Sequence, residues 1–233
     1  MSTFTQSTTA PTKPVEVPPS VQSIDDWLER FDSIYEDASG DCAQIPWAHG
    51  SPNPALIAWL NVQASSLVRP GARVAVVGCG LGRDAVALIE RGYDVCAFDA
   101  CEHAIESARA LHPRHASCFH QMDLRELPSK MHSRFDLVVE IHTVQSLPVA
   151  YRPAIAESIA SLVNHRGVLL AIARGRDERT TAESLDGPPF PLTPGELEAL
   201  FTDHGLSLVR PIDDYEDGND PPVRRLRAVF RKG

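Results

Sequence analysis

The chain has 233 residues, which is enough for one well-buried domain and short for two. Apolar residues make up 43% of it, as in ordinary globular proteins, and no apolar stretch approaches the roughly 18–20 residues of a membrane span. The formal net charge of −9 argues against a nucleic-acid partner, because nucleic-acid-binding proteins carry basic faces that neutralise phosphates.

The N-terminal segment and the cysteines narrow the class of protein. Residues 1–22 are rich in Thr, Ser and Pro and lack the continuous apolar core of a secretory signal, so we expect a disordered tail. The five cysteines are odd in number and include no CxxC pair, which predicts reduced thiols in a cytoplasmic protein without a zinc site. Residues 23–233 are expected to form a single domain.

The predicted elements begin with two helices. Residues 23–37 place apolar side chains at helical spacing, and Ser23 with Asp26 forms the pattern of a capping box. A proline-rich loop, IPWAHGSPNP, then leads to a second helix over residues 55–67. Residues 23–70 are expected to form a helical lid together with the first helix of the domain.

Strands and helices alternate over the middle of the chain. We predict strands at 73–77, 94–98, 117–121, 135–141 and 167–173, and helices at about 82–91, 102–111 and 152–163. This alternation predicts a parallel sheet with helices on both faces. The apolar runs VAVVG, FDLVVEI and GVLLAIA are typical of central strands that are buried on both sides.

The C-terminal part departs from this alternation. A short helix begins at LTPGEL, and two strand-like segments follow at 206–212 and 223–231 with an acidic loop between them. The loop leaves no room for a crossover helix, so the two segments are expected to be antiparallel. The predicted fold class is therefore α/β, with a single doubly wound, mostly parallel sheet that ends in an antiparallel hairpin.

A glycine turn between the first strand and its helix predicts a nucleotide-like ligand. Gly78, Gly80 and Gly82 follow the spacing GxGxG, and Arg83 occupies the place of the third glycine in the dinucleotide fingerprint GxGxxG. Arg83 therefore disfavours a NAD-dependent oxidoreductase, which stays an alternative. Asp99 ends the second strand, where its carboxylate can bind both hydroxyls of an adenosine ribose or cap the next helix.

Residues 74–99 resemble the first two motifs of the class I S-adenosylmethionine-dependent methyltransferases, and the terminal hairpin is similar to the end of that family's sheet. The resemblance implies seven strands in the order 3-2-1-4-5-7-6, with the seventh antiparallel. It also implies that S-adenosylmethionine binds across the carboxyl ends of the strands, with S-adenosylhomocysteine as the product. The implied cofactor contacts are Gly78, Cys79, Gly80, Gly82, Asp99, Ala100, Met122, Asp123, Leu124, Glu140 and Ile141.

The N-terminal segment resembles the lid of a narrower group, the thiopurine S-methyltransferase, tellurite-resistance and thiol methyltransferases. The resemblance rests on Trp27 with Arg30, on Pro46-Trp47 and on the PNP stretch at 52–54. It implies that Trp27 and Trp47 close over the cofactor, where an aromatic face attracts a sulfonium cation. Trp27 can equally serve to pack its helix onto the sheet.

The end of the fourth strand supplies the candidate catalytic residues. His142 can act as a general base or can only line the pocket. Glu140 is interpreted as a neighbour of the cofactor's positive charge, and Gln145 as a residue that orients the substrate. No Asp-Asn pair follows the fifth strand, so the sequence predicts an enzyme without a catalytic metal.

Residues 174–192, RGRDERTTAESLDGPPFPL, are expected to form a substrate lid loop, because connections of this length are usually functional or disordered. Its candidate substrate contacts are Arg174, Arg176 and Phe190. The arginines can hold an anionic substrate or belong to a solvated charged loop.

Together these observations predict methyl transfer to a small-molecule acceptor, with a thiol as the first candidate. The alternatives are O- or N-methylation of a phenol or amine, and a catalytically silent ligand-binding protein. The expected partner is a small-molecule substrate, with no nucleic acid and no membrane, in either a monomer or a homodimer.

Overall fold

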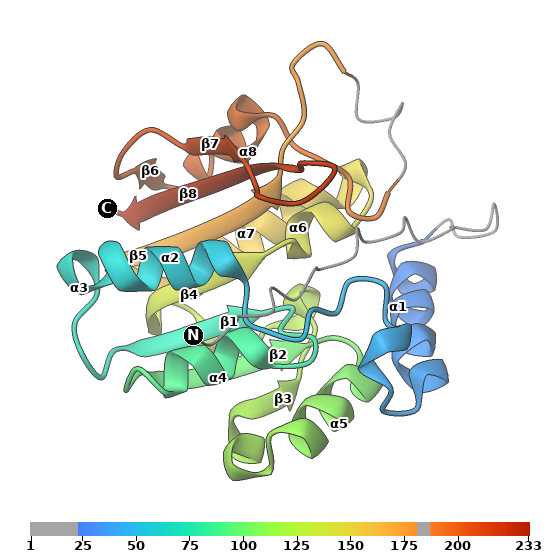
Figure 1. The fold of residues 1–233 in the computed structure, drawn as a ribbon. Coiled ribbons are helices and arrows are strands. Elements are labelled where there is room, and N and C mark those ends of the chain that lie inside the picture. Colours follow the sequence, from blue (N-terminus) through green and yellow to red (C-terminus); the bar gives the residue numbers. More distant parts are fainter. Residues whose placement is uncertain (1–22, 181–186) are drawn as a thin grey trace, which may run out of the picture.

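One β-sheet runs through the protein, whose computed structural model describes residues 23–180 and 187–233. Within these residues the strand order is β3-β2-β1-β4-β5-β8-β6, and β7 pairs with β8 beside this path (Figure 1). The strands are β1 Arg73–Val77, β2 Asp94–Asp99, β3 Phe119–Gln121, β4 Phe135–Ile141, β5 Val163–Arg174, β6 Leu206–Leu208, β7 Asp213–Glu216 and β8 Arg224–Lys232. The predicted disordered tail and residues 181–186 of the predicted lid loop lie outside the described residues.

Helices cover both faces of the sheet. They are α1 Ile24–Ala38, α2 Pro54–Val62, α3 Ala64–Leu67, α4 Arg83–Ile89, α5 Glu102–Leu111, α6 Thr143–Ser146, α7 Arg152–Leu162 and α8 Pro194–Thr202, with short 3-10 turns between some of them. One core lies between the sheet and α7 and α8, and a second lies between the sheet and α2, α4 and α5. Figure 1 shows α1 beyond the carboxyl ends of the parallel strands, beside α5.

The predicted α/β class with a parallel centre is confirmed. Strands β1 to β5 are parallel to one another, and β8 is antiparallel to β5, β6 and β7. Along β1, Val74 and Val76 pack into one core while Ala75 and Val77 pack into the other. Successive side chains of a strand point to opposite faces, so burial on both faces explains the continuous apolar run.

The acidic segment that we expected to be a loop forms strand β7 instead. The strand expected over 206–212 ends at Leu208, and Asp213 to Glu216 pair with β8. Arg227 lies 2.7 Å from Asp213, and Arg224 lies 2.5 Å from Asp214. Opposite charges across two strands stabilise the pairing, and this neutralisation makes a strand of a segment whose repeated acidic residues favoured a loop.

The remaining differences from the predicted elements concern their boundaries. The helix expected over 55–67 is divided at Gln63 into α2 and α3. The third strand begins at Phe119, after a 3-10 turn, and the fifth begins at Val163 rather than at residue 167. The expected capping box of α1 is confirmed, because Ser23 and Asp26 each accept a hydrogen bond from the other's backbone N–H.

The described chain also bears on cysteine chemistry and on membranes. All five cysteines lie in it as free thiols. Among the helices of residues 23–180 and 187–233, none combines the length and the apolar character that a membrane crossing requires.

Gly82 should tolerate a side chain less well than Gly92, although both have a left-handed backbone with φ of +76° and +84°. A Cβ at Gly82 would lie 2.4 Å from the buried ring of Phe119, whereas nothing lies within 4 Å of one at Gly92. We expect Gly92→Ala to lower the free energy of unfolding by about 1–2 kcal/mol. Gly82→Ala should lower it by about 1–3 kcal/mol more, because it also overpacks the core. Urea denaturation of both variants measures the difference, and equal losses would contradict it.

Candidate active site

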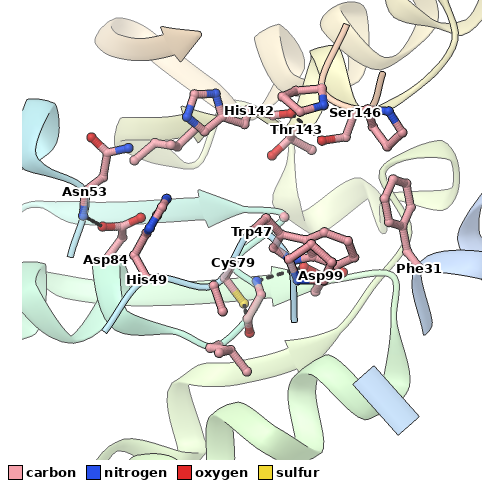
Figure 2. Close-up of a pocket in the computed structure, with 18 of the residues that line it drawn as sticks. Phe31, Trp47, His49, Asn53, Cys79, Asp84, Asp99, His142, Thr143 and Ser146 are labelled. Atoms are coloured by element: carbon pink, nitrogen blue, oxygen red, sulfur yellow. Dashed lines mark hydrogen bonds between the residues drawn. The ribbon is translucent and has the colours of Figure 1, made fainter. Parts of the chain in front are cut away.

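A cavity of about 440 Å³ opens at the carboxyl edge of the sheet. Its lining comes from α1, the segment 46–53, the glycine turn after β1, the ends of β2 and β4, and the loop 219–223. Figure 2 shows His142, Thr143 and Ser146 along one wall and Asp84, Cys79 and Asp99 along the opposite one. Doubly wound sheets bind their ligands at this edge, so this cavity is the candidate active site.

The glycine turn forms one wall because its backbone approaches other elements closely. Gly78 has a φ of +57°, and a Cβ there would lie 2.4 Å from the Thr143 hydroxyl oxygen. That hydroxyl donates a hydrogen bond to the carbonyl of Val77, which joins the start of α6 to the end of β1. Cys79 also lines the cavity, and burial holds the pKa of its thiol well above the usual value. This thiol therefore stays protonated and is a poor nucleophile.

Asp99 ties the glycine turn to the next helix. One carboxylate oxygen accepts the Gly80 N–H at 2.9 Å, and the other accepts the Cys101 N–H at 3.1 Å. Burial raises the pKa of Asp99, and these hydrogen bonds oppose that rise. Each carboxylate oxygen has more than one lone pair, so both can accept a further hydrogen bond from a ligand in the cavity.

Aromatic side chains from α1 and the loop after it close one end of the cavity. The Trp47 ring stands edge-on to Phe31 at 5.4 Å and to Tyr35 at 5.6 Å, and its Nε1 donates a hydrogen bond to the Tyr35 hydroxyl at 2.9 Å. Trp27 does not line the cavity and packs instead against Phe31 and Phe190. Of the two predicted lid tryptophans, therefore, only Trp47 faces the cavity.

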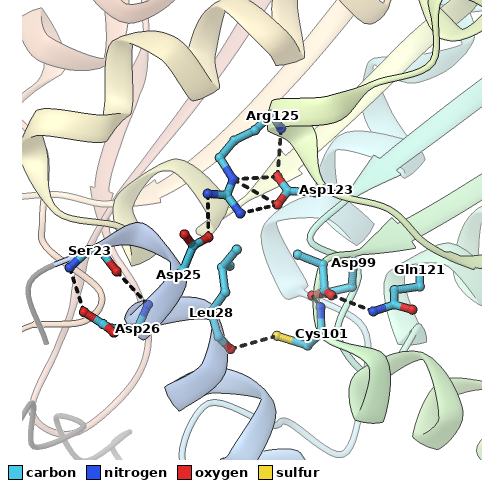
Figure 3. Close-up of polar contacts among 10 residues, drawn as sticks. Ser23, Asp25, Asp26, Leu28, Asp99, Cys101, Gln121, Asp123 and Arg125 are labelled. Atoms are coloured by element: carbon cyan, nitrogen blue, oxygen red, sulfur yellow. Dashed lines mark hydrogen bonds and ion pairs between the residues drawn. The ribbon is translucent and has the colours of Figure 1, made fainter.

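Polar contacts hold α1 against the rest of the site (Figure 3). Arg125 pairs with Asp123, which follows β3, and lies 2.7 Å from Asp25 of α1. Farther along the helix, Asp32 accepts the backbone N–H of His103 at 2.9 Å and lies 2.8 Å from its ring. The lid helix α1 is thus joined to the segment that follows β3 and to the start of α5, which follows β2.

Gln145 fixes the orientation of His142. The side-chain oxygen of Gln145 accepts the Arg174 N–H at 2.6 Å, and its nitrogen faces the carbonyls of Arg174 and Phe190 at 3.4 and 3.3 Å. A backbone N–H can only donate and a carbonyl can only accept, so the orientation of the amide is determined. The His142 Nδ1, 2.8 Å from the same oxygen, must therefore carry the hydrogen. Neutral His142 then has its free lone pair on Nε2.

His142 is neutral at ordinary pH. Burial lowers its pKa to about 4, and the positive charges of Arg225 and Arg174 add to the effect. Its backbone φ is +64°, which lies in the left-handed region. Such strain in a non-glycine residue is concentrated at functional sites.

Glu140 lies behind the cavity wall rather than in it. Its side chain is buried, and its carboxylate accepts the Val144 N–H at 3.0 Å at the start of α6. Burial raises the pKa of Glu140 to about 7, against the lowering effect of hydrogen bonds from Val144 and Thr143. Within this chain its carboxylate therefore caps α6, and Glu140 is not among the residues that line the cavity.

Of the substrate contacts predicted in residues 174–192, only Arg174 is in the cavity lining. Arg174 lines the cavity, but Arg176 does not: it donates to the carbonyls of Pro191 and Thr180 and pairs with Glu196. Phe190 is covered by Trp27. Pro188 and Pro189, from the C-terminal part of the predicted lid loop, also line the cavity.

The cavity brings together most of the predicted site residues and adds others. The predicted contacts in its lining are Trp47, Gly78, Cys79, Gly80, Gly82, Asp99, Ala100, Met122, Asp123, Leu124, Ile141, His142 and Arg174. Those outside the lining are Trp27, Glu140, Gln145, Arg176 and Phe190. The cavity is also lined by residues that were not predicted from the sequence, among them Tyr35, His49, Asp84, Arg225 and the loop 219–223. The GRD sequence that ends the glycine turn was the available signal for Asp84, and His49 stands in the IPWAHGSPNP loop between the two stretches of the lid resemblance. Tyr35, Arg225 and the loop 219–223 stand in segments without a motif.

Comparisons with known proteins agree with this geometry. A family model described as thiopurine S-methyltransferase matches residues 25–228. A probable thiol methyltransferase 2 from Arabidopsis thaliana is 27% identical over 203 residues, which span 84% of this chain and 85% of that protein.

Solved structures share the fold. One comes from work on the conversion of a disulfide bond into a thioacetal group during echinomycin biosynthesis, with a TM-score of 0.68, 22% identity, and coverage of 88% of this chain and 92% of that one. Another is the Burkholderia thailandensis 1,6-didemethyltoxoflavin-N1-methyltransferase with bound S-adenosylhomocysteine. Its TM-score is 0.72 at 20% identity, with 94% of this chain and 93% of that one covered.

Asp84→Asn should weaken the pH dependence of stability. Burial raises the pKa of Asp84 from 3.8 to about 6, while its carboxylate accepts the Asn53 N–H at 2.7 Å. The folded state therefore holds this proton more tightly than the unfolded state, so its stabilising effect is complete below about pH 4 and is lost as the pH rises through 6. The loss should be about 3 kcal/mol for a shift of this size.

Urea denaturation between pH 4 and 7.5 measures this effect. Asparagine keeps an oxygen for the Asn53 N–H but does not titrate, so the loss should disappear in Asp84→Asn. Asp94→Asn, at an exposed position of β2, is the matched control and should behave as the parent. The same pH dependence in Asp84→Asn and the parent would show that Asp84 titrates normally.

Proposed function

This chain belongs to the thiopurine S-methyltransferase family and is an S-adenosylmethionine-dependent methyltransferase, and we propose that it methylates the sulfur of a small thiol. The observation that carries the proposal is the neutral imidazole of His142 in the cavity wall, with its Nδ1 hydrogen held by Gln145.

The residues at the carboxyl edge fit the cofactor. The Asp99 carboxylate keeps lone pairs for ribose hydroxyls, and the rings of Phe31, Tyr35 and Trp47 suit a neighbouring cation. At the end of the glycine turn, the buried Nε of Arg83 has no hydrogen-bond partner among the described residues and is available to an anionic group. The backbone of the glycine turn, with Ala100, Met122, Asp123, Leu124 and Ile141, completes the set that we assign to the cofactor.

When bound, S-adenosylmethionine supplies an electrophilic methyl group with a good leaving group. The protein must then hold the acceptor in line, exclude water and remove the acceptor's proton. The lid formed by α1 and Trp47 serves the exclusion of water, since it closes one end of the cavity with aromatic side chains. His142 is our candidate for the proton acceptor, through Nε2.

The low pKa of His142 favours a thiol acceptor. A base with a pKa of about 4 is weak, so it suits an acceptor that is itself fairly acidic. A thiol has an ordinary pKa near 8.5, whereas that of a phenol is about 10. Arg174 and Arg225 also line the cavity and would stabilise a thiolate. In this account Gln145 is a positioning residue, because it acts on the acceptor only through His142.

The relatives support sulfur chemistry in the same direction. The family model carries the description of an S-methyltransferase, and the Arabidopsis relative is named a probable thiol methyltransferase. The toxoflavin neighbour is an N-methyltransferase with the same fold, so N-methylation is the alternative that the acceptor assay must address.

Transfer of a labelled methyl group to matched acceptors tests the proposal. Thiophenol, phenol and aniline have the same ring and differ in the accepting atom, so the comparison isolates that atom. We expect thiophenol to be methylated at least about 100-fold faster than the other two, since its pKa is the lowest of the acidic pair and the basic cavity wall disfavours the positive charge that forms on the nitrogen of aniline during methylation. Faster labelling of phenol or aniline would replace the thiol by an O- or N-acceptor.

His142→Gln should lower kcat by about 100-fold for an alkyl thiol that is protonated at pH 7, the lower range of general-base effects. The loss should be much smaller for an acidic aryl thiol that is already ionised, because no proton then has to be removed. Binding of S-adenosylhomocysteine, measured by calorimetry, controls for damage to the cofactor site. Equal losses with both thiols would show that His142 only shapes the pocket.

A further inference from the structure

Four side chains that are cationic or can become so gather on the acceptor side of the cavity. Arg174, Arg225, His49 and His142 all contribute to its lining. Arg225 is near enough to each of the other three to lower its pKa, although burial is the largest cause in every case. The whole chain has 31 acidic and 22 basic residues, so this local excess of positive charge runs against its composition.

The two arginines face each other across a strand pair. In the antiparallel β5–β8 ladder, Arg174 is the register partner of Arg225. Like charges at directly opposite positions destabilise a sheet. The fold therefore keeps a repulsive pair at the point where these strands meet the cavity.

Two other arginines of β8 are neutralised by acidic residues of β7. Arg227 pairs with Asp213, and Arg224 pairs with Asp214. Arg225 has an ion pair through Nε only, with Asp217 at 2.8 Å, and its two terminal nitrogens have no hydrogen-bond partner in the described structure.

The guanidinium of Arg174 has no hydrogen bond or ion pair within residues 23–180 and 187–233. Its backbone, in contrast, is held firmly: its N–H donates to Gln145, and its carbonyl accepts from Leu192 at 3.0 Å. Asp220, from the loop 219–223, also lines the cavity but makes no ion pair with either arginine in the described structure. A fixed backbone and a free guanidinium are what an anion-binding side chain requires.

We propose that the acceptor is a thiol that carries a carboxylate, which binds to Arg174 and to the terminal nitrogens of Arg225. The planar fork of a guanidinium matches the two oxygens of a carboxylate. Such a ligand removes the repulsion between the two arginines, and it places the acceptor beside His142, which shares this part of the lining. The thiol part of this inference rests on the proposed function, whereas the carboxylate site does not.

The carboxylate site has a further consequence for His142. Burial is the main cause of its low pKa, and Arg225 and Arg174 contribute to it. A carboxylate that neutralises these arginines raises the pKa of His142, so the imidazole becomes a stronger base when the acceptor is bound.

Binding without turnover tests the carboxylate site alone. The probes are 4-(methylthio)benzoate and its methyl ester, which cannot be methylated at a thiol, and calorimetry is done with the full chain saturated with S-adenosylhomocysteine. We expect the carboxylate to bind about 10- to 100-fold more tightly than the ester, the range that charge-assisted hydrogen bonds give. Equal affinities in the parent protein would overturn the proposal.

Variants then assign the site. Arg174→Met should reduce the preference for the carboxylate to near unity, and Arg174→Lys should restore part of it because the charge returns without the planar fork. Arg231→Gln is the control: it removes one positive charge at an exposed position of β8, the strand that carries Arg225, and should keep the full preference for the carboxylate. An equal loss in Arg231→Gln would mean that general charge, and not this pair, attracts the anion. Retention of the preference in Arg174→Met would also overturn the assignment.

Turnover separates this inference from the proposed function. With 4-mercaptobenzoate and its methyl ester as acceptors, the parent should show the same preference in kcat/KM. If the carboxylate probe binds but neither thiol is methylated, the anion site stands and the thiol acceptor is wrong. If both thiols are methylated equally well, the thiol acceptor stands and the anion site is wrong.

Discussion

The buried amide of Gln145 is the interaction on which the acceptor side of the site depends. The side chain of Gln145 contacts His142, Arg174 and Phe190, and the backbone carbonyl of Gln145 accepts the Phe190 N–H at 2.7 Å. It thus joins the end of β4, the end of β5 and the C-terminal part of the predicted lid loop, at Phe190. An amide can satisfy all of these partners in only one orientation, and that orientation sets both the tautomer of His142 and the position of Arg174.

Charge is distributed unequally between the structural and the functional parts of the hairpin. Away from the cavity, Asp213 and Asp214 neutralise arginines of β8 and make a strand of an acidic segment. At the cavity, Arg174 faces Arg225 and has no ion pair in the described chain, and Arg225 is paired only through its Nε, with Asp217. The same β8 therefore supplies stability with one set of side chains and an unfavourable pair with another, as expected where a site is maintained against stability.

The parts of the fold that the sequence predicts are those with local causes. The β1–α4–β2 unit follows from an apolar run, a glycine turn and a second apolar run, and most predicted contacts in that unit line the cavity. Tyr35 and Arg225 were missed because only tertiary packing brings α1 and β8 to the cavity. Trp27 and Trp47 have the same residue type and neighbouring motifs, yet only the fold shows that Trp27 packs against Phe190 while Trp47 lines the cavity.

Two buried carboxyl groups near the site, those of Asp84 and Glu140, already have hydrogen-bond partners in this chain. Asp84 and Glu140 have raised pKa values, because burial disfavours their charged forms. Each also accepts a backbone N–H at the start of a helix, Asn53 before α2 and Val144 in α6. Asp84 lines the cavity and Glu140 lies behind its wall, yet both carboxylates are held by backbone N–H groups of this chain. A buried carboxyl group beside a cavity is therefore not by itself a ligand for what the cavity holds. The residues that we assign to chemistry differ in one physical respect: His142 Nε2, the Arg174 guanidinium and the terminal nitrogens of Arg225 have no partner in the described chain, and a ligand can supply one.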